Sequence, residues 1–254
     1  MFKILLLTFY VSSLYGLTGL ELAQKMEARP KPNDLKSENT MVLINKKGKK
    51  KTSKLISKSK DDSKKQMIWF LEPKDDYGIS FLKIEHDNED DYMNMWLPGF
   101  KKFRRISSQK KSDSFMGSDL SFEDMTNREL NEYEYILDEE NVPCNDNNSD
   151  DNGCFKLISK PKDINSEYSY HITWVTKDNY LSVMEYSYDK NELLLKQKYI
   201  EFNKIEDYYV MNKLSVQNVQ KNHKTILTID KININLGYEN EIFHTKTLKR
   251  IPQN

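Results

Sequence analysis

The sequence predicts a mainly β protein, in which one antiparallel sheet curls into a barrel or a half-open half-barrel, with a short N-terminal helix and a small helical segment as cover. From about residue 39 onward, short apolar or alternating segments follow one another, and turn residues separate them. No alternation of strands with long helices interrupts this order. The aromatic residues, 11% of the chain, are spread among Ile, Val and Thr, which suits half-buried strands. With 254 residues the chain fits one large β domain or two small ones, and we expect one.

The first 16 residues predict a cleaved secretion signal. Lys3 gives a positive start, and the apolar run over residues 4–15 is too short to span a bilayer comfortably. Gly16 and Gly19 are candidate cleavage points, so residues 17–254 form the expected domain; an uncleaved anchor is the alternative. No cysteine stands directly after the signal, and no second long apolar stretch occurs. We therefore expect an exported, soluble protein without a lipid anchor.

After the signal, one helix and thirteen strands are expected. Thr18 and Glu21 have the spacing of a capping box, and an apolar stripe continues to about residue 28, before Pro30 and Pro32. The predicted strands cover residues 40–45, 50–57, 66–71, 79–85, 93–97, 102–106, 132–137, 155–159, 168–176, 180–188, 193–202, 208–216 and 225–236.

Residues 112–128 interrupt the series of strands. They contain an apolar loop at residues 115–117, and Ser118, Ser121 and Glu123 are placed to cap a short helix. The strands over 66–71 and 79–85 are apolar on both faces and therefore need cover on both sides. We expect the N-terminal helix and residues 112–128 to pack on one of these faces.

The two cysteines, Cys144 and Cys154, flank a turn-rich loop. In an oxidising compartment, a pair this close predicts a disulfide across a hairpin connection. Closing so short a loop stabilises the fold by roughly 2–3 kcal/mol. Two free thiols are the alternative if the protein is not exported.

Motifs for enzymatic chemistry are missing from the sequence. It has none of the common nucleophile, zinc-protease, phosphate-loop or C-x-x-C patterns, and its four histidines are scattered. The acidic turn after His86 lacks the ligand spacing of a cation loop, and in the loop after Asp146 the calcium pattern fails because Asp151 stands where Gly is needed. We therefore expect no catalytic residues, no metal and no cofactor.

Positive charge is concentrated between Lys46 and Lys65, although the 39 basic and 39 acidic residues of the whole chain give a net charge of zero. Lysines protect the edge of a hairpin against aggregation. The alternative is docking to an anionic membrane surface, where each Lys contributes roughly 1 kcal/mol. Nucleic acid is a poor partner for an exported protein.

Two long motifs resemble the outer-membrane lipoprotein-sorting protein family, the LolA-like carriers. They are MWLPGFKKFRRI, at residues 95–106, and DSFMGSDLSFED, at residues 113–124. Shorter stretches, MVLINKKG at 41–48, WFLEP at 69–73 and FHTKTL at 243–248, are also similar, so the resemblance covers nearly the whole chain after the signal. It implies a LolA/LolB-like incomplete barrel, with helices as a lid over an apolar cavity that takes acyl chains.

The resemblance directs attention to apolar residues that line such a cavity. Met and aromatic side chains suit ligands of irregular shape. The candidates are Phe81, Met93, Met95, Leu97, Phe115 and Met116. Ordinary core packing is the alternative for each of them. Arg104 or Arg105 is expected to meet a lipid headgroup or an acidic partner, or else to form a salt bridge at the barrel rim.

The resulting functional hypothesis is a monomeric, non-enzymatic periplasmic carrier. It would bind the acyl chains of a lipoprotein or lipid, act as their chaperone toward the outer membrane, and meet an inner-membrane transporter or release complex. The alternative is a sensor or accessory protein of an envelope exporter with the same fold. An envelope hydrolase is disfavoured by the missing motifs.

Overall fold

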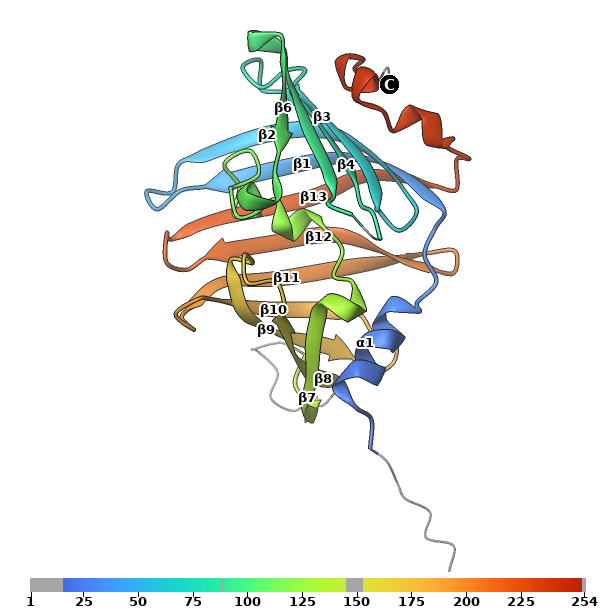
Figure 1. Ribbon diagram of the computed structural model, residues 1–254, viewed down its shortest axis with the longest axis vertical. Coiled ribbons are helices and arrows are strands. Elements are labelled where there is room, and N and C mark those ends of the chain that lie inside the picture. The colour runs from blue at the N-terminus through green and yellow to red at the C-terminus, as the bar shows by residue number, and fades with distance from the viewer. Residues whose placement is uncertain (1–15, 88, 145–152, 253–254) are drawn as a thin grey trace, which may run out of the picture.

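The computed structural model describes residues 16–87, 89–144 and 153–252. Within them, thirteen antiparallel strands form one open sheet in the order β6-β5-β4-β3-β2-β1-β13-β12-β11-β10-β9-β8-β7, which curls around its lid side (Figure 1). The predicted half-open antiparallel sheet is confirmed. The strands are β1 (Asp34–Ile44), β2 (Lys50–Lys60), β3 (Lys65–Glu72), β4 (Ser80–Ile84), β5 (Tyr92–Leu97), β6 (Lys102–Ile106), β7 (Tyr133–Val142), β8 (Cys154–Pro161), β9 (Tyr168–Thr176), β10 (Ser182–Asp189), β11 (Leu194–Ile205), β12 (Tyr208–Asn218) and β13 (His223–Ile234). The predicted signal at residues 1–16 lies, except for Gly16, outside the described residues.

The order of the strands explains the lid. The chain enters the sheet in the middle with β1, proceeds by hairpins to the edge strand β6, and resumes at the opposite edge with β7. Residues 107–132 connect the two edges, and Figure 1 shows this connection in green, crossing in front of the sheet. A segment that joins opposite edges of a curled sheet must pass over one of its faces. We call residues 112–128, the central part of this connection, the lid segment.

Helix α1 (Gly19–Glu27) begins as the sequence predicts. Thr18 accepts a hydrogen bond from the Glu21 amide, and the Glu21 carboxylate accepts one from the Thr18 amide, which together make the capping box. The helix buries Leu22 and Ala23 against Leu157 of β8. The expectation that this helix covers the early strands is wrong, because it packs beside β7 and β8 at the far edge (Figure 1).

The early strands are instead covered by two other segments. On the lid side, Phe70 and Phe81 pack with Phe115 and Phe122 of the lid segment. On the opposite side, Trp69 of β3 and its neighbours pack against the C-terminal turns η5 (Asn240–Ile242) and η6 (Thr245–Lys249). The last predicted strand was extended to residue 236, but β13 ends at Ile234 and the chain turns back to supply this cover.

Cys144 and Cys154 are joined by a disulfide. The bond connects the chain after β7 to the first residue of β8 and so closes the hairpin at one edge of the sheet. Residues 145–152, between them, lie outside the described residues.

Candidate functional site

The lid segment is fixed to the sheet by two phenylalanine rings. The ring of Phe115 lies 5.3 Å from that of Phe81 and 5.8 Å from that of Phe122, in edge-to-face arrangements. Both lid rings are nearly inaccessible to solvent. The lid therefore shares one apolar core with the lid-facing residues of β1 to β6.

Beside this core, a groove of about 450 Å³ lies between the lid segment and the middle of the sheet. Its apolar lining includes Leu55 and Ile68 of β2 and β3, Leu227 of β13, and Met125 of the lid. The groove therefore offers apolar walls beneath a connection that is not itself part of the sheet.

Small polar residues on neighbouring strands explain why the groove is not filled. Ser37 of β1 lies directly opposite Ser57 of β2, and Ser59 follows two residues later on the same face. All three line the groove, and all are buried. Their side chains are too short to reach the lid, whereas Leu or Phe at these positions would occupy the space.

Charged side chains of both signs contribute to the lining of the groove. Arg29, Lys31 and Lys60 are basic, Asp34 and Asp62 are acidic, and Lys31 pairs with Asp62. Burial lowers the pKa of Arg29, although the nearby carboxylate of Asp62 acts in the opposite direction. These cations are suited to a negatively charged headgroup whose apolar chains lie in the groove.

A buried ionic cluster holds the lid to the second half of the sheet. The carboxylate of Asp124, on the lid, lies 2.8 Å from Nζ of Lys196 and 2.6 Å from Nζ of Lys198, both on β11. The Tyr168 hydroxyl donates to the same carboxylate at 2.9 Å. Burial alone would raise the pKa of Asp124, but the charges of Lys198 and Lys196 hold this pKa well below its usual range.

Arg128, at the end of the lid segment, forms a second, partly buried contact. Its guanidinium donates two hydrogen bonds to Glu185 of β10, at 2.6 and 2.9 Å, which is a bidentate pair. It also lies 3.2 Å from Nδ1 of His171, which is 2.8 Å from the Ser187 hydroxyl. Burial and the Arg128 charge hold the pKa of His171 well below its usual range. His171 and Ser187 are both completely buried, so this pair supports the structure and is closed to a substrate.

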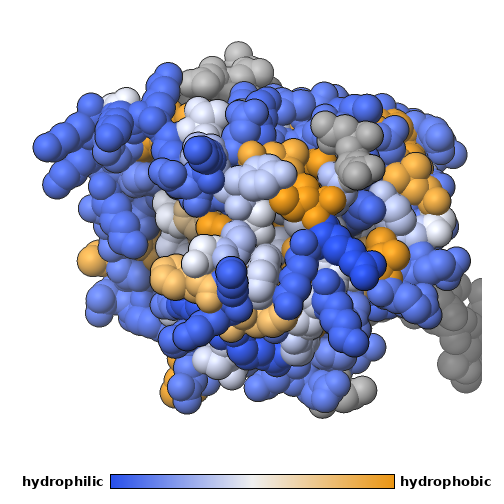
Figure 2. Space-filling view, turned by 90° about the horizontal axis from the view of Figure 1, so that it is seen from above, coloured by the Kyte–Doolittle hydropathy of each residue, from blue (hydrophilic) through white to orange (hydrophobic). Residues whose placement is uncertain are grey.

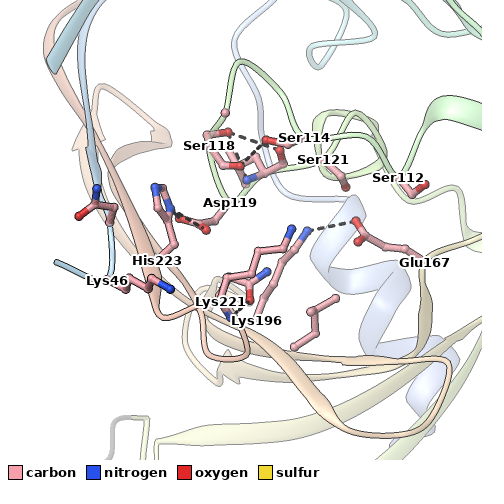
Figure 3. A pocket seen from close by; sticks show the side chains of 15 residues that line it. Lys46, Ser112, Ser114, Ser118, Asp119, Ser121, Glu167, Lys196, Lys221 and His223 are labelled. Atoms are coloured by element: carbon pink, nitrogen blue, oxygen red, sulfur yellow. Dashed lines mark hydrogen bonds and ion pairs between the residues drawn. The ribbon is translucent and has the colours of Figure 1, made fainter. Parts of the chain in front are cut away.

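The lid also contacts β13, at a smaller polar pocket of about 280 Å³ (Figure 3). Asp119 accepts a hydrogen bond from the Thr225 hydroxyl at 2.7 Å and lies 2.8 Å from Nδ1 of His223. Figure 3 shows Asp119 pointing at His223, while Lys196 points at Glu167 across the pocket. The lid is therefore fastened to both halves of the sheet.

The six predicted lining residues lie together, but in the packed core beside the groove. Phe81, Met93, Met95 and Phe115 are almost fully buried in one cluster, and Leu97 and Met116 pack against it. None of the six belongs to the lining of the groove. They form the apolar core on which the lid rests, and a role in binding stays a prediction.

The predicted headgroup contacts lie elsewhere on the surface. Arg104 is exposed and lies 3.6 Å from Asp113, and the Arg105 guanidinium lies 4.0 Å from the centre of the Tyr92 ring. Neither lines the groove. Both arginines are on the edge strand β6.

The lysines between Lys46 and Lys65 do not form one surface. Those of the β1–β2 turn are exposed, whereas Lys64 and Lys65, at the other end of β2, pair with Asp87 and Asp61. Among the described residues, no group of His, Cys, Asp and Glu is arranged to hold a metal ion. In the same part of the chain, no helix has the length and apolar character needed to cross a membrane.

Comparison with known proteins identifies the class of protein that this fold and lid define. A LolA superfamily protein from Nitrosomonas europaea superimposes with a TM-score of 0.71 over 91% of this chain and 100% of that chain, at 14% identity, and thus shares the fold. An outer membrane lipoprotein-sorting protein domain from Vibrio parahaemolyticus superimposes with a TM-score of 0.84 at 28% identity, over 91% and 98% of the two chains. The half-open sheet with its crossing lid is the LolA-like fold.

The family follows from the sequence match. A family model with the description "Uncharacterized protein" matches residues 62–250, and a DUF1329 family protein from Desulfovibrio piger is 29% identical, with a TM-score of 0.82 over 91% and 97% of the two chains. No curated protein gives a significant match. The chain belongs to the family that this model describes, and its fold is that of the lipoprotein-sorting protein domain and the LolA superfamily protein, which its two long motifs resemble.

Proposed function

We propose that this protein is a non-enzymatic periplasmic carrier, which binds the acyl chains of a lipoprotein or lipid and moves them toward the outer membrane. The observation that supports it most directly is the lid-covered groove, whose apolar walls lie beside charged side chains that include Arg29, Lys31 and Lys60. Each methylene that enters such a groove contributes about 0.8 kcal/mol, so a short stretch of acyl chain supplies useful affinity. The predicted signal at residues 1–16 supports the periplasmic location.

The lid supports the carrier hypothesis because a carrier must open and close. The lid contacts the sheet through side chains, and backbone pairing within the sheet does not depend on these contacts. Displacing the lid would therefore expose the groove while the ladders between neighbouring strands remain. A sensor of the same fold would also bind a lipid, but it would not need to release it to a second acceptor.

A substitution that fills the groove tests this proposal. We expect Ser57→Leu to weaken binding of a fluorescent fatty-acyl probe by about tenfold or more, because the new side chain occupies the space of two or three methylenes, at about 0.8 kcal/mol each. The matched control is Ser215→Leu. Ser215 follows Leu214, which lines the groove, and so lies on the opposite face of β12.

Further experiments make this test interpretable. Thermal unfolding of both variants separates a filled groove from a damaged fold, and Ser37→Leu repeats the experiment from the neighbouring strand. Native mass spectrometry of protein purified from its own cell envelope should show a bound lipid or acylated peptide. If folded Ser57→Leu protein binds the probe as the unchanged protein does, the groove is not the acyl site.

A further inference from the structure

Exposed aromatic side chains gather at the end of the molecule formed by the β3–β4 and β5–β6 turns. Phe100 is 76% exposed, Tyr77 is 54% exposed and Phe103 is 39% exposed. The two turns touch each other, because a Cβ at Gly78 would lie 3.5 Å from Cγ of Pro98. We call Tyr77, Phe100 and Phe103 the aromatic tip.

Basic side chains surround the aromatic tip. The exposed ones are Lys74, Lys101, Lys102, Arg104, Lys249 and Arg250. Nζ of Lys249 lies 5.1 Å from the centre of the Phe103 ring, so the C-terminal turn belongs to the same surface. The nearby acidic residues are fewer: Glu72, Asp75, Asp113, which lies 3.6 Å from Arg104, and Asp76, whose carboxylate lies 2.6 Å from Nζ of Lys51. This end of the molecule is therefore positively charged.

The turn that carries Phe100 is fixed in place. Pro98–Phe100 form a 3-10 turn, in which the Lys101 amide donates to the Pro98 carbonyl at 3.1 Å. The ring of Phe103 packs against Trp96 of β5 at 4.9 Å between ring centres. The Phe100 ring has no such cover and remains in solvent. Figure 2, which views the molecule from above, shows hydrophobic side chains set among hydrophilic ones on this face.

The opposite ends of the same strands carry charges of both signs, and there Lys64, Lys83 and Lys111 pair with acidic residues of the β4–β5 turn. The β4–β5 turn, over residues 85–91, contains five acidic residues and one histidine, and the β11–β12 turn is Glu206-Asp207. In an antiparallel sheet, alternate turns lie at opposite ends of the strands, so these turns lie away from the aromatic tip. The excess of cations is therefore greater at the aromatic tip, and a negatively charged surface would attract this end of the sheet more strongly.

We propose that the aromatic tip docks this protein on an anionic lipid bilayer, with Phe100 at the boundary between headgroups and acyl chains. Aromatic rings are favoured at this boundary, and each Lys or Arg near an anionic surface contributes roughly 1 kcal/mol. A protein interface would need a broad apolar centre, whereas the tip has three aromatic side chains surrounded by cations. The inference is independent of the groove.

Vesicle flotation tests the proposal with the full mature chain. The chain should float with vesicles of phosphatidylglycerol and phosphatidylcholine, bind pure phosphatidylcholine much less, and lose binding as salt rises. Phe100→Ser and the double variant Lys101→Glu, Lys102→Glu should each lower binding by about tenfold or more, since two charge reversals remove at least 2 kcal/mol at roughly 1 kcal/mol per cation.

Matched controls use exposed residues away from the tip. Ile164→Ser removes an 87% exposed apolar side chain, and the double variant Lys190→Glu, Lys204→Glu reverses two exposed lysines, one in the β10–β11 turn and one near the end of β11. These controls should bind vesicles as the unchanged protein does, and all variants should still bind the acyl probe. Absent vesicle binding, or equal loss in tip and control variants, would overturn the proposal and leave the groove hypothesis untouched. Unchanged binding by both tip variants would overturn it as well.

Discussion

Replacing Asp124 by Asn tests how the lid is held. This carboxylate is almost fully buried and faces the ammonium groups of Lys196 and Lys198 at 2.8 and 2.6 Å. Removing one partner from a buried ionic cluster usually costs 3–5 kcal/mol, because the remaining charges stay out of water. Lys196 keeps Glu167 and Lys198 keeps Glu185, so we expect a loss near the lower end, about 3 kcal/mol.

Urea unfolding followed by intrinsic fluorescence measures this loss, and hydrogen exchange of the lid amides shows where it acts. The control is Glu201→Gln, which breaks a pair with Lys213 that is as short, at 2.6 Å, but exposed. It should change the free energy of unfolding by less than about 1 kcal/mol. If Asp124→Asn is no more destabilising than this control, the cluster does not hold the lid.

A double variant separates charge from packing at the same place. With Asp124→Asn in place, Lys198→Met removes one of the uncompensated ammonium groups while keeping a similar length of side chain. The two substitutions should therefore be less destabilising together than the sum of their separate effects. Simple additivity would mean that the two residues do not interact, contrary to their 2.6 Å contact.

Three further predictions concern pH, packing and the disulfide. The folded-state pKa of His171 lies below its unfolded value, so the unfolded chain binds the extra proton and the free energy of unfolding should fall as pH drops below about 6.5; His171→Asn should flatten this part of the curve in urea titrations at several pH values. Gly19→Ala should destabilise the fold by about 1–3 kcal/mol in thermal unfolding, because the added Cβ would lie 2.7 Å from the Ile136 backbone, whereas exposed Gln24→Ala should not. Reduction of Cys144–Cys154 should add about 2 Da in mass spectrometry and lower the unfolding free energy by roughly 2–3 kcal/mol; an unchanged melting temperature after complete reduction would contradict this.

The strands could be predicted from the sequence because their signal is local. Alternation and turn residues located all thirteen, and β9 (Tyr168–Thr176) was predicted with its observed bounds. The partners of the early strands could not be predicted in the same way. Nothing in the pattern around Trp69 shows whether a helix at the N-terminus or turns at the C-terminus will cover it, since that depends on which edges the chain reaches.

The groove was missed for a physical reason. The predicted lining residues, such as Phe81 and Met95, are large and apolar, but a cavity forms where side chains are small, and large ones fill the core. The signal that was present is the set of serines at alternating positions, Ser57 and Ser59 on β2, within a strand that otherwise contributes to the core. Serines at alternating inward positions of a core strand therefore predict a cavity, as a run of aromatic residues predicts a packed core.

The ionic cluster had a signal of the same kind. Lys196 and Lys198 alternate on β11 and therefore share a face, and that face is the covered one. A lysine pair inside a sheet predicts a buried carboxylate from another segment, since an isolated buried charge is too costly to retain. Sequence alone did not show that the lid supplies it, because Asp124 lies 72 residues away from Lys196 along the chain.

Topology and electrostatics together determine how the groove can open. The lid is covalently continuous with β6 and β7, and each of these edge strands has one neighbour in the sheet, so the central ladders of β1, β2 and β13 do not have to break. What must break are the packing of Phe115 and Phe122 in the apolar core and the side-chain contacts of Asp119, Asp124 and Arg128 with the sheet. The cations of the lid contacts, Lys196, Lys198 and Arg128, do not line the groove, so a headgroup beside Arg29 or Lys31 does not compete for them directly. For the proposed carrier, the burial of an acyl chain in the groove therefore has to offset the loss of both the apolar and the charged contacts of the lid.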